Sequence, residues 1–178
     1  YRNIKNAILF LLSGNMAAII AVLFTSFMGL PVPFAPVHLL FINLLTDSLP
    51  AIAIGMEPTD ASLLKEKPRD PSEGILNKSF FTKIITQGAL IAVAVMTAYY
   101  IGAAQSPQLA STMAFATLTL ARLFHGFNCR TDRSIFKVGF KANPSSIYAF
   151  IAGVLLLAAV IFIPVLHGLF EVVAINST

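Results

Sequence analysis

The sequence predicts an all-α integral membrane protein, folded as one helical bundle of about five transmembrane helices. Of its 178 residues, 57% are apolar and 11% are charged, whereas soluble domains carry about 25% charged residues. The mean hydropathy of +0.81 also points to the bilayer. Apolar stretches of the roughly 20 residues that a spanning helix needs alternate with short polar segments. Together these observations exclude an ordinary water-soluble domain.

The first predicted helix follows a basic start and has no small-residue cleavage site behind it, so we expect a retained helix rather than a signal peptide. Three prolines, Pro31, Pro33 and Pro36, then require a turn before the second helix. The predicted helices cover residues 5–28, 37–55, 80–102, 109–127 and 145–166. They form a single transmembrane domain over residues 1–178.

Two longer polar segments separate these helices. Residues 57–79 are rich in proline and carry charges of both signs, and residues 128–144 are basic, so both are predicted to lie in water. Eleven of the twelve Lys and Arg residues fall before the first helix, in or just after the 57–79 loop, or in the 128–144 loop. The positive-inside rule therefore predicts a cytoplasmic N-terminus and an extracytoplasmic C-terminal tail. The odd number of helices predicts a piece of a larger membrane protein.

The composition also argues against several function classes. The net charge of +4 does not predict nucleic-acid binding, because the basic residues are spread over separate loops. A single cysteine, Cys129, excludes a disulfide scaffold. The three histidines lack partners at metal-ligand spacing and are expected to pack or to lie at interfaces; they are His38, His125 and His167. Residues 176–178 fit a glycosylation acceptor, a pattern that is common by chance.

Asp47 gives the sharpest functional signal, because a carboxylate in mid-membrane costs about 2.5–3.5 kcal/mol. Asn43 lies one helical turn earlier and Thr46 directly precedes Asp47, so three oxygen-bearing side chains are expected on one face. Pro50 has no N–H and should break the helix and release the carbonyl of Thr46. Such oxygens would begin a calcium-like shell of about six to eight ligands. The plainer alternative is a polar kink that only joins helices.

Two further polar residues lie inside predicted helices. Asn15 is a second candidate ligand, or it makes an interhelical hydrogen bond worth roughly 0.6 kcal/mol. Arg122 either extends to the headgroups, or faces the bundle and pairs with Asp47. The sequence leaves both alternatives open.

Four segments resemble a known family, the P-type cation-transporting ATPases of subclass II, and in particular the calcium pumps and their bacterial relatives. YRNIK at residues 1–5 and LSGN at residues 12–15 resemble the fifth membrane helix of the family. LLFINLLTDSLP at residues 39–50 closely matches the sixth helix, and KPRDP at residues 67–71 resembles the loop that follows. The resemblance covers essentially the whole chain and implies that it is the carboxyl-side transmembrane part, helices five to nine of ten.

The resemblance implies that Asn15, Asn43, Thr46 and Asp47 are metal ligands, with Asp47 central. It also implies a departure. Members that carry two calcium ions have a glutamate where this chain has Ala18. They also have a carboxylate in the eighth helix, and alignment from Thr112 places Arg122 at that position. We therefore expect one calcium ion per cycle, with Arg122 supplying space-filling and charge in place of the second ion. Manganese also accepts oxygen ligands.

For the full protein, the resemblance implies an ATP-driven calcium-transporting ATPase in the bacterial plasma membrane. ATP and magnesium would bind cytosolic domains outside this chain, which carries no catalytic residue. Its expected partners are membrane lipids, those domains and the remaining transmembrane helices. The alternative is a secondary cation/proton antiporter or channel segment with Asp47 as the relay. A structural membrane subunit is the third possibility.

Overall fold

A computed structural model describes residues 1–58, 76–131, 138–139 and 142–175 of the chain. The regular elements among these residues are all helical. They are α1 (Arg2–Phe27), α2 (Pro36–Phe41), the π-helical segment η1 (Ile42–Thr46), α3 (Ser48–Gly55), α4 (Lys78–Ala103), α5 (Pro107–Cys129), α7 (Pro144–Phe162) and α8 (Pro164–Phe170). The predicted all-α fold class is confirmed. The motif at residues 67–71 and the acceptor pattern at residues 176–178 lie outside the described residues.

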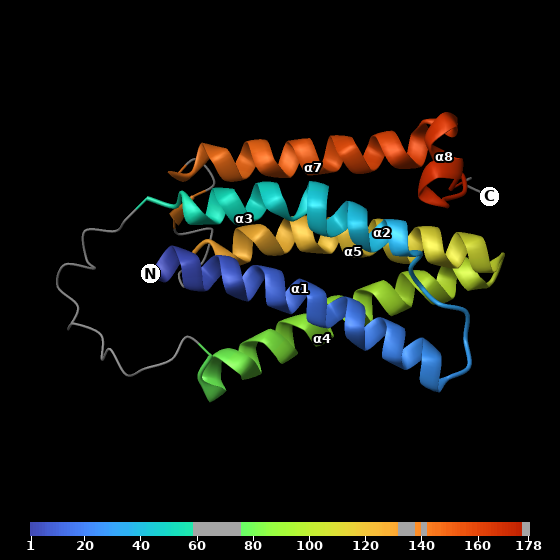
Figure 1. The fold of residues 1–178 in the computed structure, drawn as a ribbon, viewed down its shortest axis with the longest axis horizontal. Helices are drawn as coiled ribbons and strands as arrows, with labels where there is room; N and C mark the ends of the chain where they lie inside the picture. Colours follow the sequence, from blue (N-terminus) through green and yellow to red (C-terminus); the bar gives the residue numbers. More distant parts are fainter. Residues whose placement is uncertain (59–75, 132–137, 140–141, 176–178) are drawn as a thin grey trace.

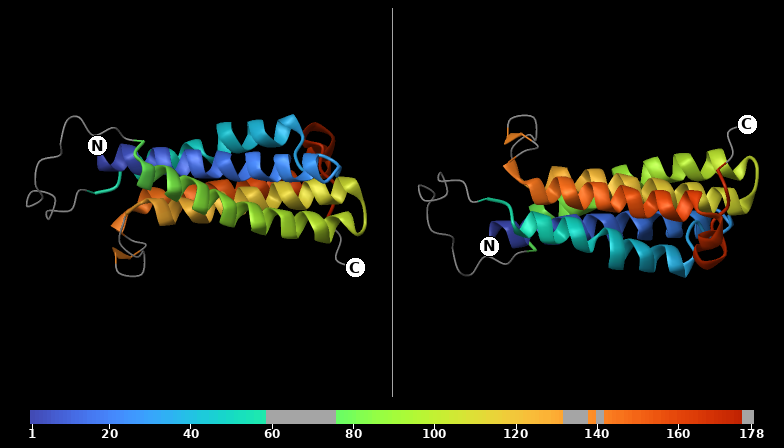
Figure 2. Two further views of the ribbon diagram at one scale, coloured as in Figure 1. Left: turned by 90° about the horizontal axis from the view of Figure 1, so that it is seen from below. Right: turned by 90° about the horizontal axis from the view of Figure 1, so that it is seen from above.

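The long helices form one elongated bundle (Figure 1). α1, α5, α7 and the interrupted helix made of α2, η1 and α3 run along its length, and α4 crosses α1 and lies beside α5. The N-terminus and the residues that border positions 59–75 lie at one end. The turns that join α1 to α2 and α4 to α5 lie at the other end (Figure 2). The predicted topology likewise has the N-terminus and the 57–79 loop on one side of the membrane and these two turns on the other.

Four helices of the described chain are long and apolar enough to cross a membrane: α1, the α2–α3 helix, α4 and α7. α5 has 23 residues, which is long enough to span, but it contains polar residues such as Arg122 and His125. Its neighbours bury these two side chains, and a helix covered by other helices need not be apolar all round. Together with α5, these four helices of the described chain agree with the predicted membrane bundle of about five helices.

Side-chain caps fix where three of the helices begin. Asn77 Oδ1 accepts a hydrogen bond from the N–H of Phe80 at the start of α4. Ser106 does the same for α5 and Asn143 for α7, and each is followed by a proline. A polar residue at the cap followed by proline is favoured at helix starts, because the first N–H groups have no partner within the helix.

The last predicted helix, residues 145–166, is not continuous. α7 ends at Phe162, Ile163 is extended with ψ of 109°, and Pro164 begins the separate helix α8. The cause is Pro164, since the residue before a proline is disfavoured in the helical region. α8 then packs on α2, where His38 Nδ1 accepts from the N–H of Ala35 and Nε2 donates to Phe170 O at 2.7 Å. His38 therefore packs between α2 and α8, which is one of the two roles expected for the histidines.

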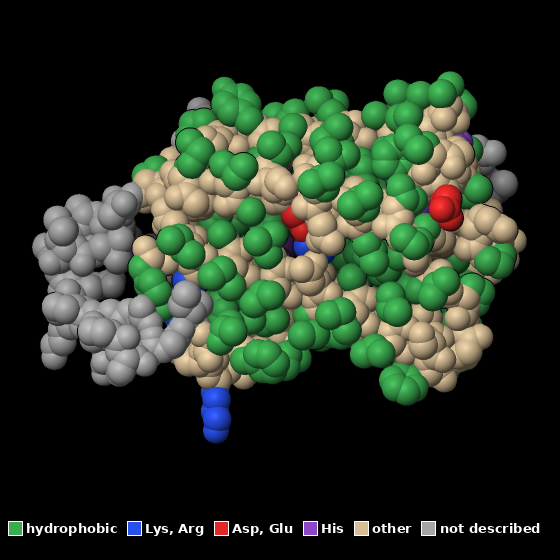
Figure 3. All heavy atoms as spheres, in the orientation of Figure 1, with side chains coloured by type: hydrophobic (Ala, Val, Ile, Leu, Met, Phe, Trp, Pro, Cys, Tyr) green, Lys and Arg blue, Asp and Glu red, His purple; other side chains and the backbone are tan. Residues whose placement is uncertain are grey.

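Apolar side chains are spread over the face of the bundle shown in Figure 3. Large side chains such as Leu44, Val93 and Leu155 are more than half exposed. A few acidic and basic atoms are visible in a small gap near the centre of the face in Figure 3. Such a surface suits contact with lipid or with further helices, and it isolates the few polar groups inside.

Candidate cation site

Asp47 lies where the second spanning helix changes its winding. The N–H of Asp47 bonds to Ile42 O at 2.8 Å, five residues back, which is the π-helical pattern. The regular winding resumes when Ala51 N bonds to Asp47 O at 3.0 Å. Pro50, one residue earlier, has no N–H to donate to the carbonyl of Thr46. The helix therefore changes its winding one turn before Pro50, at the carboxylate itself.

Arg122 on α5 reaches Asp47 across the bundle. Its Nη2 donates to Asp47 Oδ2, and the two residues are 2% and 1% exposed. Of the two alternatives from sequence, Arg122 therefore faces inward and does not extend to the headgroups. Nη1 and Nη2 also donate to Asn15 Oδ1, both at 3.2 Å. Asn15, Asp47 and Arg122 thus come together from α1, the junction of η1 with α3, and α5.

The polar atoms of this pair are not all used. Asp47 Oδ1 and Arg122 Nε are buried and have no hydrogen-bond partner among the described residues. An unpaired buried carboxylate oxygen is costly unless it has a partner of opposite charge. The described part of the chain contains no group of three His, Cys, Asp or Glu residues that could hold a metal. Further ligands from the described residues would be amide, hydroxyl or backbone oxygens.

The other predicted site residues are only partly assembled. Thr46 is buried and its hydroxyl donates to Ile42 O at 3.1 Å. Asn43 is exposed, so the expected single face of Asn43, Thr46 and Asp47 is not observed. The π-helical turn explains this correction, because side chains four residues apart align in an α-helix but not where the winding is looser. Ala18 is buried on α1.

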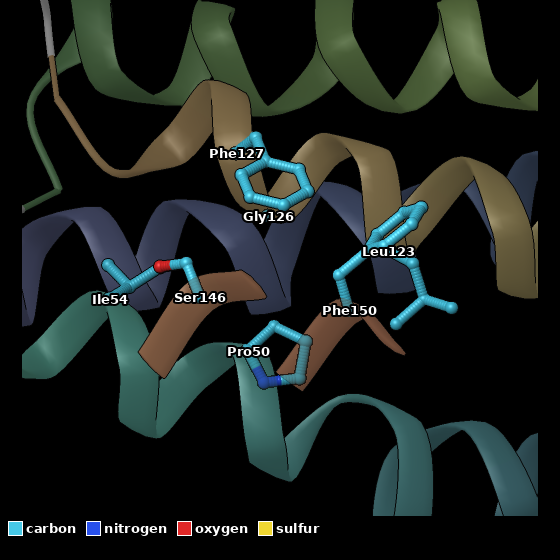
Figure 4. Close-up of a pocket in the computed structure, with 7 residues that line it drawn as sticks. All are labelled: Pro50, Ile54, Leu123, Gly126, Phe127, Ser146 and Phe150. Carbon is cyan, nitrogen blue, oxygen red and sulfur yellow. The ribbon is translucent and has the colours of Figure 1, made fainter. Parts of the chain in front are cut away.

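Pro50 contributes to a different feature, a small pocket between α3, α5 and α7 (Figure 4). Its ring lies in α3 and faces Leu123 and Phe150 across that pocket. The residues around the pocket are Pro50, Ile54, Leu123, Gly126, Phe127, Ser146 and Phe150. The Ser146 hydroxyl is the only side-chain oxygen among them, so this pocket is a poor place for an ion.

Two polar groupings were not predicted from sequence. His125 Nε2 lies 2.8 Å from Ser13 Oγ and 3.2 Å from Cys129 Sγ, joining α1 to α5 one turn from Arg122. The spacing of Arg122, His125 and Cys129 along one face of α5 was the available signal. These contacts give His125 a packing role, which is one of the two roles expected for the histidines.

The second grouping, which we call the end cluster, consists of Glu57, Arg130 and Asn143. Arg130 Nε and Nη2 donate to the two carboxylate oxygens of Glu57 at 2.8 and 3.0 Å. Asn143 Nδ2 donates to Glu57 Oε2 at 2.7 Å and to Ala53 O at 2.8 Å. The cluster joins the ends of α3 and α5 to the start of α7.

The chain is similar to known cation-transporting ATPases. Residues 31–178 match the family model described as cation transporting ATPase, C-terminus. The chain is 39% identical over 99% of its length to a calcium-transporting ATPase of Bacillus subtilis, and 42% identical over its whole length to one of Listeria monocytogenes. It is 31% identical over 96% of its length to calcium-transporting ATPase type 2C member 2 of Rattus norvegicus. The chain covers 20% of each bacterial relative and 18% of the rat relative.

Proposed function

The chain belongs to the cation-transporting ATPases, as part of their C-terminal region, and on that basis we propose that it is the ion-translocating membrane part of an ATP-driven calcium pump. The relatives that are similar over nearly the whole chain are named calcium-transporting ATPases. This membership also removes the reason to prefer a secondary antiporter. Because the chain covers about a fifth of these relatives, the proposal concerns its role within a longer protein.

One observation carries the proposal: Asp47 is a buried membrane carboxylate with one oxygen held by Arg122 and the other without a partner in the described chain. A hard divalent cation prefers carboxylate, amide and carbonyl oxygens. Asp47 Oδ1 can serve such an ion while Oδ2 stays on Arg122. The neighbouring Asn15 supplies an amide oxygen that now accepts from the guanidinium.

The proposed ligands from this chain are Asn15, Asn43, Thr46 and Asp47. Asn43 is exposed in a stretch whose neighbours Leu44 and Leu45 are exposed as well. An amide on such an apolar face needs a partner within the membrane. We propose that remaining transmembrane helices of the same pump cover this face and complete the shell. Four ligands fall short of the six to eight that calcium takes, so further oxygens must come from those helices or from water.

A single calcium ion per cycle is the finer part of the proposal. The Arg122 guanidinium occupies the space beside Asp47 where a second cation would need ligands, and Ala18 offers no side-chain oxygen. Two positive charges in the same buried space repel each other strongly at low dielectric. Arg122 would thus exclude a second ion while neutralising part of the charge on Asp47.

The remaining proposals concern the whole protein. ATP and magnesium would bind its cytosolic domains, and movements there would reach the membrane site through α1 and the 57–79 loop. The bundle would lie in a bacterial plasma membrane in contact with lipid, with the N-terminus cytoplasmic and the C-terminal tail outside. The start of α1 and the short helix α8 lie at opposite ends of the bundle, as expected for termini on opposite sides of a membrane.

The direct test is Asp47→Asn in the full-length pump. We expect calcium-dependent phosphorylation from ATP to need calcium concentrations at least about a hundredfold higher, because removing a charged partner typically costs several kcal/mol. Phosphorylation from inorganic phosphate without calcium should persist and serves as the control for folding. Wild-type calcium affinity in Asp47→Asn would remove Asp47 from the site.

A further inference from the structure

Gly14 on α1 lies directly beneath the Arg122 side chain. A Cβ atom built on Gly14 would come within 2.5 Å of both Cζ and Nε of Arg122, and within 2.8 Å of Nη2. Real Cβ atoms do not make contacts this short. The guanidinium therefore lies against the backbone of α1, in space that is free only because residue 14 has no side chain.

The position of Gly14 in the helix makes this contact informative. Gly14 is in the middle of α1, and its backbone does not require a positive φ. Glycine is less favourable than alanine inside a helix, so local structure gives no reason for it here. The neighbouring residues give the reason, because Asn15 Oδ1 and Asp47 Oδ2 hold the guanidinium on this side of α1.

We propose that Gly14 is a positioning residue for the ion site: its missing side chain admits the Arg122 guanidinium and lets it hold Asp47. Residue 14 then determines whether Arg122 can stand in the place of a second ion. A methyl group at position 14 would move the far end of a flexible side chain and leave the backbone in place. This inference rests on the proposed function for its effect on calcium, but its steric basis does not depend on any ion.

The steric basis is tested without calcium, by thermal unfolding of the purified full-length protein in detergent with a chelator. We expect Gly14→Ala to lower Tm by about 2 °C or more. In an Arg122→Ala background the same substitution should leave Tm unchanged or raise it, because alanine favours the helix once the guanidinium is gone. If Arg122→Ala does not fold, Asp47→Asn with Arg122→Ala removes both charges and serves as the background.

Gly55→Ala in α3 is the matched control. Its added Cβ would meet nothing within 4 Å, so it should have the same effect on Tm in every background. An equal loss of Tm from Gly14→Ala with and without Arg122 would overturn the inference, since the glycine would then serve only the packing of α1.

The consequence for the site is tested with calcium-dependent phosphorylation. Moving the guanidinium frees Asp47 Oδ2, so Gly14→Ala should raise the apparent calcium affinity by about fivefold. It should change the affinity of the Arg122→Lys variant less, because an ammonium on a flexible stem can bend past the methyl group. Equal shifts in the two backgrounds would overturn the inference and leave the calcium proposal intact. Absence of any calcium response in the wild type would overturn the proposed function, and the Tm comparison would still decide the role of Gly14.

Discussion

Two buried carboxylate–arginine pairs join the same two regions of the molecule, and their carboxylates differ in how fully they are bonded, although each arginine keeps one buried nitrogen without a partner in the described chain. At the end of the bundle, Glu57 accepts from Arg130 with both oxygens and from Asn143 with one of them. In the middle, Asp47 uses Oδ2 for Arg122 and leaves Oδ1 without a partner in the described chain. Both carboxylates flank α3, and both arginines belong to α5 or its C-cap.

The difference separates a structural pair from a candidate binding pair. A buried ion pair is maintained only if good geometry and additional hydrogen bonds repay the desolvation of both charges. The end cluster meets that condition at its carboxylate, with a two-pronged contact of the kind that guanidinium makes best. The middle pair does not, and it keeps an acceptor available inside the membrane. Burial of a charge pair alone thus says little about function, whereas the unused oxygen points to a ligand.

Among the substitutions that test this difference, Glu57→Ala should lower stability the most. It leaves Arg130 buried without its carboxylate, and removing one partner of a buried pair costs about 3 kcal/mol or more. Thermal unfolding of the full-length protein should show that loss, while the calcium affinity of the folded protein stays close to that of the wild type. Glu57→Gln keeps an acceptor and should lose less stability. A large loss of calcium affinity with unchanged stability would mean that the end cluster belongs to the ion site.

A second pair of substitutions tests the role of the middle pair. Replacing Arg122 and Ala18 together by glutamate supplies two carboxylates where the proposed second ion is excluded. Equilibrium binding of radioactive calcium to the full-length pump should then rise from one ion per molecule to two. Ala18→Glu alone should stay at one, because its carboxylate would pair with the remaining guanidinium. One ion bound by the double variant would show that Arg122 is not what limits the number of ions.

The sequence predicts the middle pair much better than the end cluster, for a physical reason. Charges are rare within apolar stretches, so Asp47 and Arg122 stand out, and each needs a partner that only the other helices can offer. Glu57 and Arg130 lie in polar segments, where charged residues are usual and no pattern indicates burial. The sequence does not predict the role of Gly14 either, because a glycine in an apolar helix does not indicate which side chain lies against it.

In the fold, too, the length and composition of the apolar stretches predict the helices, whereas local changes in helix winding were not predicted. The lengths of the apolar stretches predict the helical bundle because the bilayer sets them. The exposure of Asn43 depends on a π-helical turn, and a four-residue spacing read as α-helix misplaces it. Pro164 could have predicted the break at Ile163. The helix was nevertheless predicted to continue, because the residues on both sides of Pro164 are apolar.

The smallest effect concerns Asn143, which serves the end cluster in two ways. Its Oδ1 caps α7 and its Nδ2 bonds Glu57 and Ala53. Asn143→Ala should therefore cost about 1–2 kcal/mol of stability, because it removes the cap of α7 and the hydrogen bonds to Glu57 and Ala53. In a Glu57→Ala background the cost should fall, because the bond from Asn143 Nδ2 to Glu57 no longer exists there. The effects of two residues in contact on stability do not simply add. Calcium affinity should not change in either background. If it fell as it would for a substitution of Asn15, the two carboxylate–arginine pairs would act as one connected system through α3 and α5, and the separation between them would be lost.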